Sequence, residues 1–182
     1  MFLMWQSIGF AGGPPSRRPW PPARLPVLVA AAVALLGCND DPGPPIPVPL
    51  VPLGVESTWQ EARKCRTSHE HWLHSVRVVV NPLAWKAYTS WLPLDPANTP
   101  FPVGSVVVKP EYDDQFCKNL IGYTVMRKEP AGYWPAANDW HWQRLDANRK
   151  ILEDGKLAKS CASCHQSHCD PPAGYDFTCT PD

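Results

Sequence analysis

The spacing of hydrophobic and polar residues along the chain predicts several short strands. Two β-branched runs, SVRVVVNP at 75–82 and VGSVVVK at 103–109, predict strands, and the second is expected to end at Pro110. LIGYTVMRK at 120–128 and DWHWQRL at 139–145 predict two more, because both are rich in β-branched and aromatic residues. The segment GYDFTC near the C-terminus is expected to form a short closing strand.

Two segments carry a helical pattern. Asn81 is expected to cap a helix that starts at Pro82, because an Asn cap suits a proline at the first helical position. The apolar face of that helix is expected to consist of Leu83, Trp85, Tyr88 and Trp91. LEDGKLAKSCASCHQ, at 152–166, predicts a second, short helix. Because strands outnumber helices, we expect an α+β fold with an antiparallel β-sheet and a few helices.

The N-terminal part of the chain has the organisation of an export signal. Arg17, Arg18 and Arg24 precede the apolar run LPVLVAAAVALL at 25–36, which Gly37 and Cys38 follow. This order is typical of a signal peptide, which is expected to cover residues 1–37. LLGC also resembles a bacterial lipobox, in which the cysteine is diacylated and becomes the new N-terminus. We therefore expect a lipid anchor on Cys38 and a place in the bacterial periplasm or cell envelope; the alternative is an ordinary signal peptide or membrane anchor with a chance cysteine.

The residues after Cys38 are expected to form a linker. The segment NDDPGPPIPVPLVPLG contains many of the 23 prolines of the chain, and such a composition favours an extended, semi-rigid conformation. We expect a linker at 38–54 and one folded domain at 55–182. The alternative is that part of the linker packs as an N-terminal strand.

The charge composition argues against nucleic acid as a partner. The chain has 17 Lys and Arg against 17 Asp and Glu, and the expected domain has no basic run. Nucleic-acid-binding domains normally carry a basic patch or stripe. We therefore expect no nucleic-acid partner.

The sequence CASCH, at 161–165, is the strongest chemical signal in the chain. Two cysteines three positions apart on a helix can each bond a haem vinyl group, and the adjacent His165 can bind the iron from the same side. The motif therefore predicts one covalent haem c held by Cys161, Cys164 and His165. A thioredoxin-like redox pair is a second interpretation, but the βαβ context is missing. Zinc bound by these residues, with His168 or Cys169, is a third.

The position of the motif bears on the sixth iron ligand. None of the residues after His165 is methionine, whereas electron-transfer cytochromes c take an axial methionine from far downstream of the motif. Met126, in a predicted strand, and His141 are the alternative sixth ligands. Without them, we expect an open iron face, which is suited to ligand binding or catalysis rather than simple electron transfer.

Five stretches in order resemble the cytochrome P-460 family, including its cytochrome c-prime-beta relatives. They are VRVVVNPLAW, GSVVVKPEY, GYTVMRK, GYWPAANDWHW and CASCHQ with YDFTCT, and they extend from about His71 to Thr180. The resemblance implies a β-rich domain with a C-terminal haem. It also implies a small nitrogen compound (hydroxylamine or NO) as ligand or substrate, another cytochrome as redox partner, and a homodimer.

The resemblance also assigns roles to individual residues. Hydroxylamine-oxidising members carry a lysine, matched here by Lys109, that is bonded to a haem meso carbon. Alternation places Ser105, Val107 and Lys109 on one face of the strand, so Lys109 faces either solvent or a pocket. Thr124 stands where those members carry a carboxylate above the iron. Thr124 can only hydrogen-bond a ligand, which puts hydroxylamine chemistry in doubt and favours NO binding.

The remaining candidate residues are a polar pair and four cysteines. Arg77 and His74 flank the first predicted strand and are candidate polar groups of the pocket. Cys65, Cys117, Cys169 and Cys179 are expected to form two disulfides in an exported protein, with three possible pairings. We favour Cys169–Cys179, which brackets a proline turn, with Cys65–Cys117 as the other.

These observations leave three functional hypotheses. The first is a membrane-tethered P-460-type cytochrome that oxidises a small nitrogen compound, with Lys109, Arg77 and Thr124 in its catalytic site. The second is a non-catalytic NO-binding protein like cytochrome c-prime-beta. The third is a six-coordinate electron carrier that uses Met126 or His141.

Overall fold

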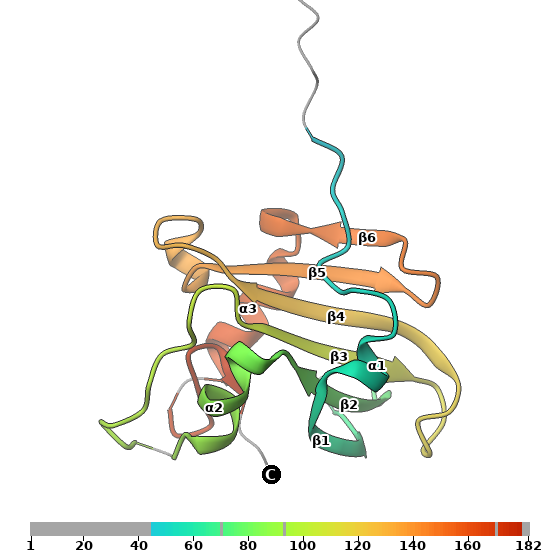
Figure 1. Ribbon diagram of the computed structural model, residues 1–182, viewed down its shortest axis with the longest axis horizontal. Coiled ribbons are helices and arrows are strands. Elements are labelled where there is room, and N and C mark those ends of the chain that lie inside the picture. The colour runs from blue at the N-terminus through green and yellow to red at the C-terminus, as the bar shows by residue number, and fades with distance from the viewer. Residues whose placement is uncertain (1–44, 70, 93, 170, 180–182) are drawn as a thin grey trace, which may run out of the picture. The chain divides into compact units, whose positions relative to one another are not determined.

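Six antiparallel strands form one sheet in which each strand pairs with the next along the chain (Figure 1). The computed structural model describes residues 45–69, 71–92, 94–169 and 171–179. The strands are β1 (Gln60–Thr67), β2 (Ser75–Val80), β3 (Val106–Tyr112), β4 (Leu120–Lys128), β5 (Trp140–Asp146) and β6 (Ile151–Asp154). The expected α+β class with an antiparallel sheet is therefore confirmed. The signal peptide and Cys38 lie outside the described residues.

The helices are few and short. They are α1 (Val55–Thr58), α2 (Pro82–Ser90) and α3 (Lys159–His168), with two 3-10 turns, η1 (Pro135–Ala137) and η2 (Gly155–Leu157). A separate pair of two-residue strands, β7 (Gly174–Tyr175) and β8 (Thr178–Cys179), follows α3 where one closing strand was expected. Within the described residues, none of the helices has the length and apolarity needed to span a membrane.

Strand β3 does not end at Pro110 as the sequence suggested. It continues to Tyr112, and Pro110 pairs with Tyr123 of β4. On the β2 side the ladder has no registered pair at Lys109 or Pro110, although it is intact before and after them. The missing N–H of proline therefore falls where the ladder needs no donor, and the strand carries two more residues than expected past Pro110.

Two further expectations need correction. The stretch expected as one helix at 152–166 begins as β6 and η2, and only its second half is α3. In α2 the cap is as expected, since Asn81 Oδ1 accepts from Ala84 N at 3.0 Å. Of the expected apolar face, Tyr88 and Trp91 are buried, whereas Leu83 is 53% exposed and Ala84 and Ala87 are buried in its place.

The two faces of the sheet are covered by different parts of the chain. We call one the packed face, defined by Val79, Val106, Val108, Tyr123, Val125 and Leu145, which are buried with Val51 and Val55. We call the other the cavity face, defined by Val78, Val80, Val107, Met126, Trp140 and Trp142, which are buried with residues of α2 and α3. In Figure 1 α1 lies in front of the sheet and α3 behind it.

The end of the proline-rich linker belongs to the folded unit. Gln143 of β5 accepts from Leu50 N and donates to Val48 O, both at 2.8 Å, and Val51 is 1% exposed. The ordered packing therefore begins before Val55, because this segment covers the packed face.

Candidate functional site

Helix α3 carries the CASCH motif and packs against the cavity face through Ala162, with Cys161 partly buried beside it. Cys161 and Cys164 are free thiols, whereas Cys65–Cys117 and Cys169–Cys179 are disulfides among the described residues. The favoured disulfide pairing is thus confirmed. Burial raises the pKa of the Cys161 thiol. The two cysteines of the motif are therefore the ones left for another bond.

His165 is held in one tautomer. Its Nδ1 lies 2.6 Å from the carbonyl oxygen of Phe177, and a carbonyl can only accept, so Nδ1 carries the proton and Nε2 the lone pair. Burial lowers the pKa of His165 to about 3, and the positive charges of Lys109 and His71 act in the same direction. The ring packs edge-on against Trp142, with centroids 4.6 Å apart. A neutral imidazole with a free Nε2 is the form that binds a metal.

The turn that supplies the Phe177 carbonyl is anchored by Asp176. Both turn residues are left-handed, with φ of 49° at Asp176 and 62° at Phe177, as in two-residue hairpin turns. The Asp176 carboxylate accepts from Lys128 Nζ at 2.7 Å and from Phe101 N at 3.1 Å, and also from Asn138 Nδ2. Its carbonyl oxygen accepts from Trp140 Nε1 at 2.8 Å. These contacts fix the turn, and with it the orientation of His165.

A cavity of about 270 Å³ lies between α3 and the sheet. Cys161, Cys164 and His165 line it from the helix. From the strands it is lined by Val107, Lys109, Thr124, Met126, Trp142 and Arg144, among others. The strand pairing explains this set, since Lys109 pairs with Thr124 and Thr124 with Arg144, while Val107 pairs with Met126 and Met126 with Trp142. Lys109, which the sequence placed either in solvent or in a pocket, therefore faces the cavity.

Lys109 belongs to a chain of polar contacts. Its Nζ lies 3.2 Å from His71 Nε2, and His71 Nδ1 lies 3.0 Å from Glu111 Oε1. The second oxygen of Glu111 lies 3.7 Å from His74 Nδ1. Burial raises the pKa of Glu111, but the hydrogen bond from His71 and the charges of both histidines outweigh it, so the pKa lies below its usual value. Glu111 is therefore a buried carboxylate near the cavity.

Not every predicted residue reaches the cavity. Arg77 is an ion-pair partner of Glu61, with Nε 2.6 Å from Oε1, and it does not line the cavity, so its expected role as a pocket group is wrong. His74 contacts Glu111 and lines a neighbouring cavity. His141 bonds Asp154 and Glu129 through its two ring nitrogens, whereas Met126 does line the cavity.

Sequence reasoning missed His71 and Glu111. Glu111 lies two positions after Lys109, so alternation places both on one strand face once β3 is known to pass Pro110. His71 comes from the loop between β1 and β2, and nothing in the local pattern indicates that this loop reaches Lys109. Glu111 therefore had a sequence signal, whereas His71 had none.

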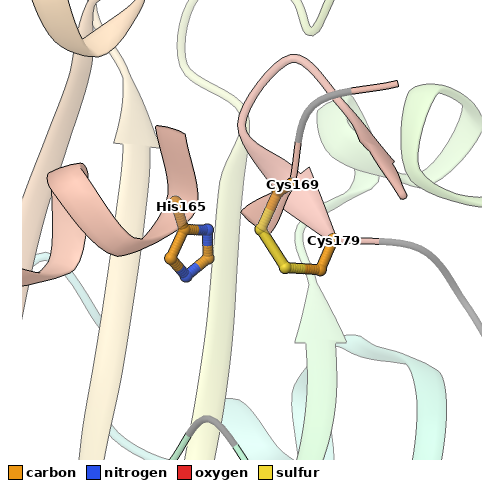
Figure 2. A group of neighbouring side chains, drawn as sticks. All are labelled: His165, Cys169 and Cys179. Atoms are coloured by element: carbon orange, nitrogen blue, oxygen red, sulfur yellow. A yellow bond between two sulfur atoms is a disulfide. The ribbon is translucent and has the colours of Figure 1, made fainter. Parts of the chain in front are cut away.

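A zinc site built from thiolates fits the geometry less well than a covalent haem does. Among the described residues, the group with metal-ligand spacing is His165, Cys169 and Cys179, whose ligand atoms lie within 4.8 Å of one another. Figure 2 shows the imidazole ring of His165 beside the bonded sulfurs of the two cysteines. Disulfide sulfurs are not thiolates and bind zinc poorly. The zinc interpretation also loses Cys169 as a ligand.

The residues present fit a covalent haem. Two free thiols and an imidazole with an available Nε2 share one wall of the cavity, as attachment requires. Arg66 Nε and Trp142 Nε1 are buried without a hydrogen-bond partner among the described residues, and both side chains line the cavity. Buried donors of this kind are normally satisfied, so a group with acceptor atoms suits the cavity.

No protein-family model matches this chain, and no curated protein matches its sequence.

Proposed function

We propose that this protein is a mono-haem c-type cytochrome of the P-460 type that binds or oxidises a small nitrogen compound. Thioether bonds from Cys161 and Cys164 would hold the haem, and His165 Nε2 would bind its iron. The observation that carries the proposal is that two free thiols and a neutral imidazole of one tautomer line the same cavity wall. When bound, the haem supplies an iron centre for a ligand such as hydroxylamine or NO.

Residues of the sheet supply the groups of this site that can contact a ligand. Lys109 faces the cavity and is the candidate for a third covalent tether. Thr124, its partner across β3 and β4, offers a hydroxyl that can hydrogen-bond a ligand but cannot act as a carboxylate base. The packing of Trp142 against His165 restricts rotation of the imidazole ring. Together these groups can position a small polar ligand opposite α3.

Two other functions remain as alternatives, each favoured by one observation. Thr124 in place of a carboxylate favours a non-catalytic NO-binding protein like cytochrome c-prime-beta. Met126 lines the cavity and favours a six-coordinate electron carrier. His141 is less suited to that role because both of its ring nitrogens contact carboxylates.

The cellular setting is part of the same proposal. Two disulfides in a small domain suit an oxidising compartment outside the cytoplasm. The signal peptide and lipidated Cys38 would place the protein in the periplasm or cell envelope, where another cytochrome would accept its electrons. A homodimer is the form that the family resemblance implies.

The test is the optical spectrum and intact mass of the protein produced with a cytochrome c maturation system. We expect one haem that survives denaturation in the wild type and is lost in the Cys161→Ala, Cys164→Ala double variant. The Cys65→Ala, Cys117→Ala variant is the matched control, because it removes a cysteine pair away from the cavity. A zinc-containing protein without haem would overturn the proposal.

The same spectra separate the alternatives. A Lys109 tether should give a strongly red-shifted ferrous Soret band and a mass two hydrogen atoms lighter, and both should be lost in Lys109→Ala. Tight NO binding without hydroxylamine turnover would favour the NO-binding alternative. A low-spin six-coordinate spectrum that becomes high-spin in Met126→Leu would favour the electron carrier.

A further inference from the structure

Three side chains from two parts of the fold form a continuous line of contacts that ends in the cavity. Glu111 and Lys109 lie on the same side of β3, and His71 from the β1–β2 loop bridges them at 3.0 Å and 3.2 Å. The carboxylate Oε1 can only accept from Nδ1 when it is ionised. Nδ1 is then the protonated nitrogen, which leaves Nε2 as an acceptor aimed at the amine of Lys109.

We infer that Glu111, His71 and Lys109 act as a carboxylate–imidazole–amine triad that makes Lys109 a nucleophile. His71 Nε2 takes one proton from the Lys109 ammonium, and Glu111 stabilises the imidazolium that forms. Loss of this proton leaves the amine with a lone pair, and rotation about the Cε–Nζ bond can turn that pair toward the cavity, which Lys109 lines. A nucleophile, a base and a group that orients the base are the parts of activated nucleophiles in general. The inference rests on the proposed function only in taking a carbon of the bound cofactor as the target. Forming that C–N bond removes one hydrogen from Nζ and one from the carbon, so the step also consumes a two-electron oxidant such as a peroxide.

Burial favours this arrangement over an ordinary surface ion pair. The side chains of Glu111 and His71 are 7% and 12% exposed, so water screens their interaction weakly. His74 lies 3.7 Å from the other oxygen of Glu111 and helps to keep the carboxylate ionised.

The other charged and titratable groups around the cavity, taken together, also favour loss of a proton from Lys109. Those that line it are Arg66, Arg144, Glu153, His165, His168 and the thiols of Cys161 and Cys164. Glu153 is paired with Arg144 at 2.8 Å, which leaves Arg66 as a further cation in the lining of the same cavity. A nearby cation disfavours the ammonium form of a lysine and so assists loss of its proton.

The test uses the holoprotein and asks how Lys109 reacts. Intact mass and peptide mapping first give the fraction of Lys109 joined to the cofactor. Any unjoined Lys109 is labelled with acetic anhydride from about pH 6 to about pH 10, a range that spans imidazole and amine titration. The acetylation rate of Lys109 at neutral pH is divided by the constant rate that it reaches at alkaline pH. This neutral-to-plateau ratio removes the effect of accessibility. The exposed Lys86 in the same digest is the internal reference.

We expect wild-type Lys109 to be joined to the cofactor, or to have a neutral-to-plateau ratio about tenfold or more above that of Lys86. His71→Gln and Glu111→Gln should abolish the joining or lower the ratio about tenfold, while the haem stays on the cysteines. Glu111→Asp should restore part of the effect. His74→Gln is the matched control and should keep most of the joining or of the ratio, because His74 lies 3.7 Å from the Glu111 oxygen that does not bond His71.

Several results would overturn the triad. One is a wild-type Lys109 that is unjoined and titrates like Lys86. Another is joining or labelling that is unchanged in His71→Gln and Glu111→Gln. A third is an equal loss in His74→Gln, which would indicate general damage to the pocket. A protein without haem whose Lys109 still shows the high ratio would overturn the proposed function and support the triad.

Discussion

Strand β3 presents two different sides. One side carries Val106, Val108, Pro110 and Tyr112, all of which are buried in the packed face or beside it. The other carries Val107, Lys109 and Glu111, which alternate with the first set, and Val107 and Lys109 line the cavity. Three of the four residues on the first side are therefore apolar. On the second side, polar residues outnumber apolar ones.

The difference between the two sides separates stability from chemistry. The packed face is covered by the chain itself, through Leu50 to α1, and its residues contact one another. The cavity face keeps an internal space and places Lys109 and Glu111 on a buried strand, where polar groups need specific partners. Mutations on the packed face should therefore change the free energy of unfolding alone, whereas mutations on the cavity side should also change the site.

The largest effect is expected from Asp176, which anchors the turn beside His165. Asp176→Ala leaves Lys128, whose side chain is 12% exposed, without its carboxylate partner, and a buried charge of this kind destabilises a fold by about 3–5 kcal/mol. The turn should also release the Phe177 carbonyl from His165 Nδ1. Urea unfolding and the optical spectrum of the holoprotein should therefore both change.

The control for Asp176 is an exposed carboxylate of the same type. Asp113→Ala removes bonds to Asn119 Nδ2 at the surface and should change the free energy of unfolding by less than about 1 kcal/mol. Its spectrum should match the wild type. An Asp176→Ala protein that is destabilised but has an unaltered spectrum would show that the turn does not orient His165.

An intermediate effect is expected from Leu145, which is 1% exposed in the packed face. Leu145→Ala should lower the free energy of unfolding by about 3 kcal/mol, through lost apolar burial and the cavity that remains. The cofactor content and spectrum should stay as in the wild type, because Leu145 belongs to the packed face and does not line the cavity beside α3. Leu152→Ala, at a residue 47% exposed, is the control and should change the stability by about 0.5 kcal/mol or less. A change of spectrum in Leu145→Ala would remove the separation between the two faces.

The sequence predicted the central strands because their side chains are buried in a regular pattern. The bounds of β4, Leu120–Lys128, agree with the expectation, and β2 and β5 agree to within two residues at either end. Strand β1 was missed because QEARKCRT is a polar edge strand with irregular pairing to β2 and only partial burial. Such a strand is held by its neighbour, and its own pattern carries little signal.

The site was predictable where its residues are close in sequence. Cys161, Cys164 and His165 lie within one turn and a half of α3, so their spacing alone indicated that they act together. The contact of Phe177 with His165 and that of His71 with Lys109 depend on how loops fold over the sheet. The family resemblance singled out Lys109, whereas Arg77, proposed as a pocket group from its place beside the first predicted strand, pairs with Glu61 instead.

The smallest effect is a difference in pH dependence between the two sides of the sheet. The pKa of Glu111, in the line of contacts that reaches the cavity, lies below its usual value of 4.5, since its histidine contacts outweigh burial. The unfolded chain then binds more protons than the fold near that pH, so the stability from Glu111 is present above about pH 4.5 and is lost as the pH falls through the folded pKa. The pKa of Tyr123 on the packed face is raised by burial and by its bond to Glu56, so its stabilisation is present below about pH 10 and is lost above it.

Urea unfolding across the pH range should therefore separate the two groups. Glu111→Gln should flatten the acid-side decline in the free energy of unfolding and leave the alkaline side unchanged, and Tyr123→Phe should do the reverse. Each change should amount to at most about one proton in the slope, or about 1.4 kcal/mol per pH unit. If Glu111→Gln left the acid-side slope intact, Glu111 would not be held ionised by His71 and His74. The carboxylate of the triad would then be missing, and the triad would be overturned.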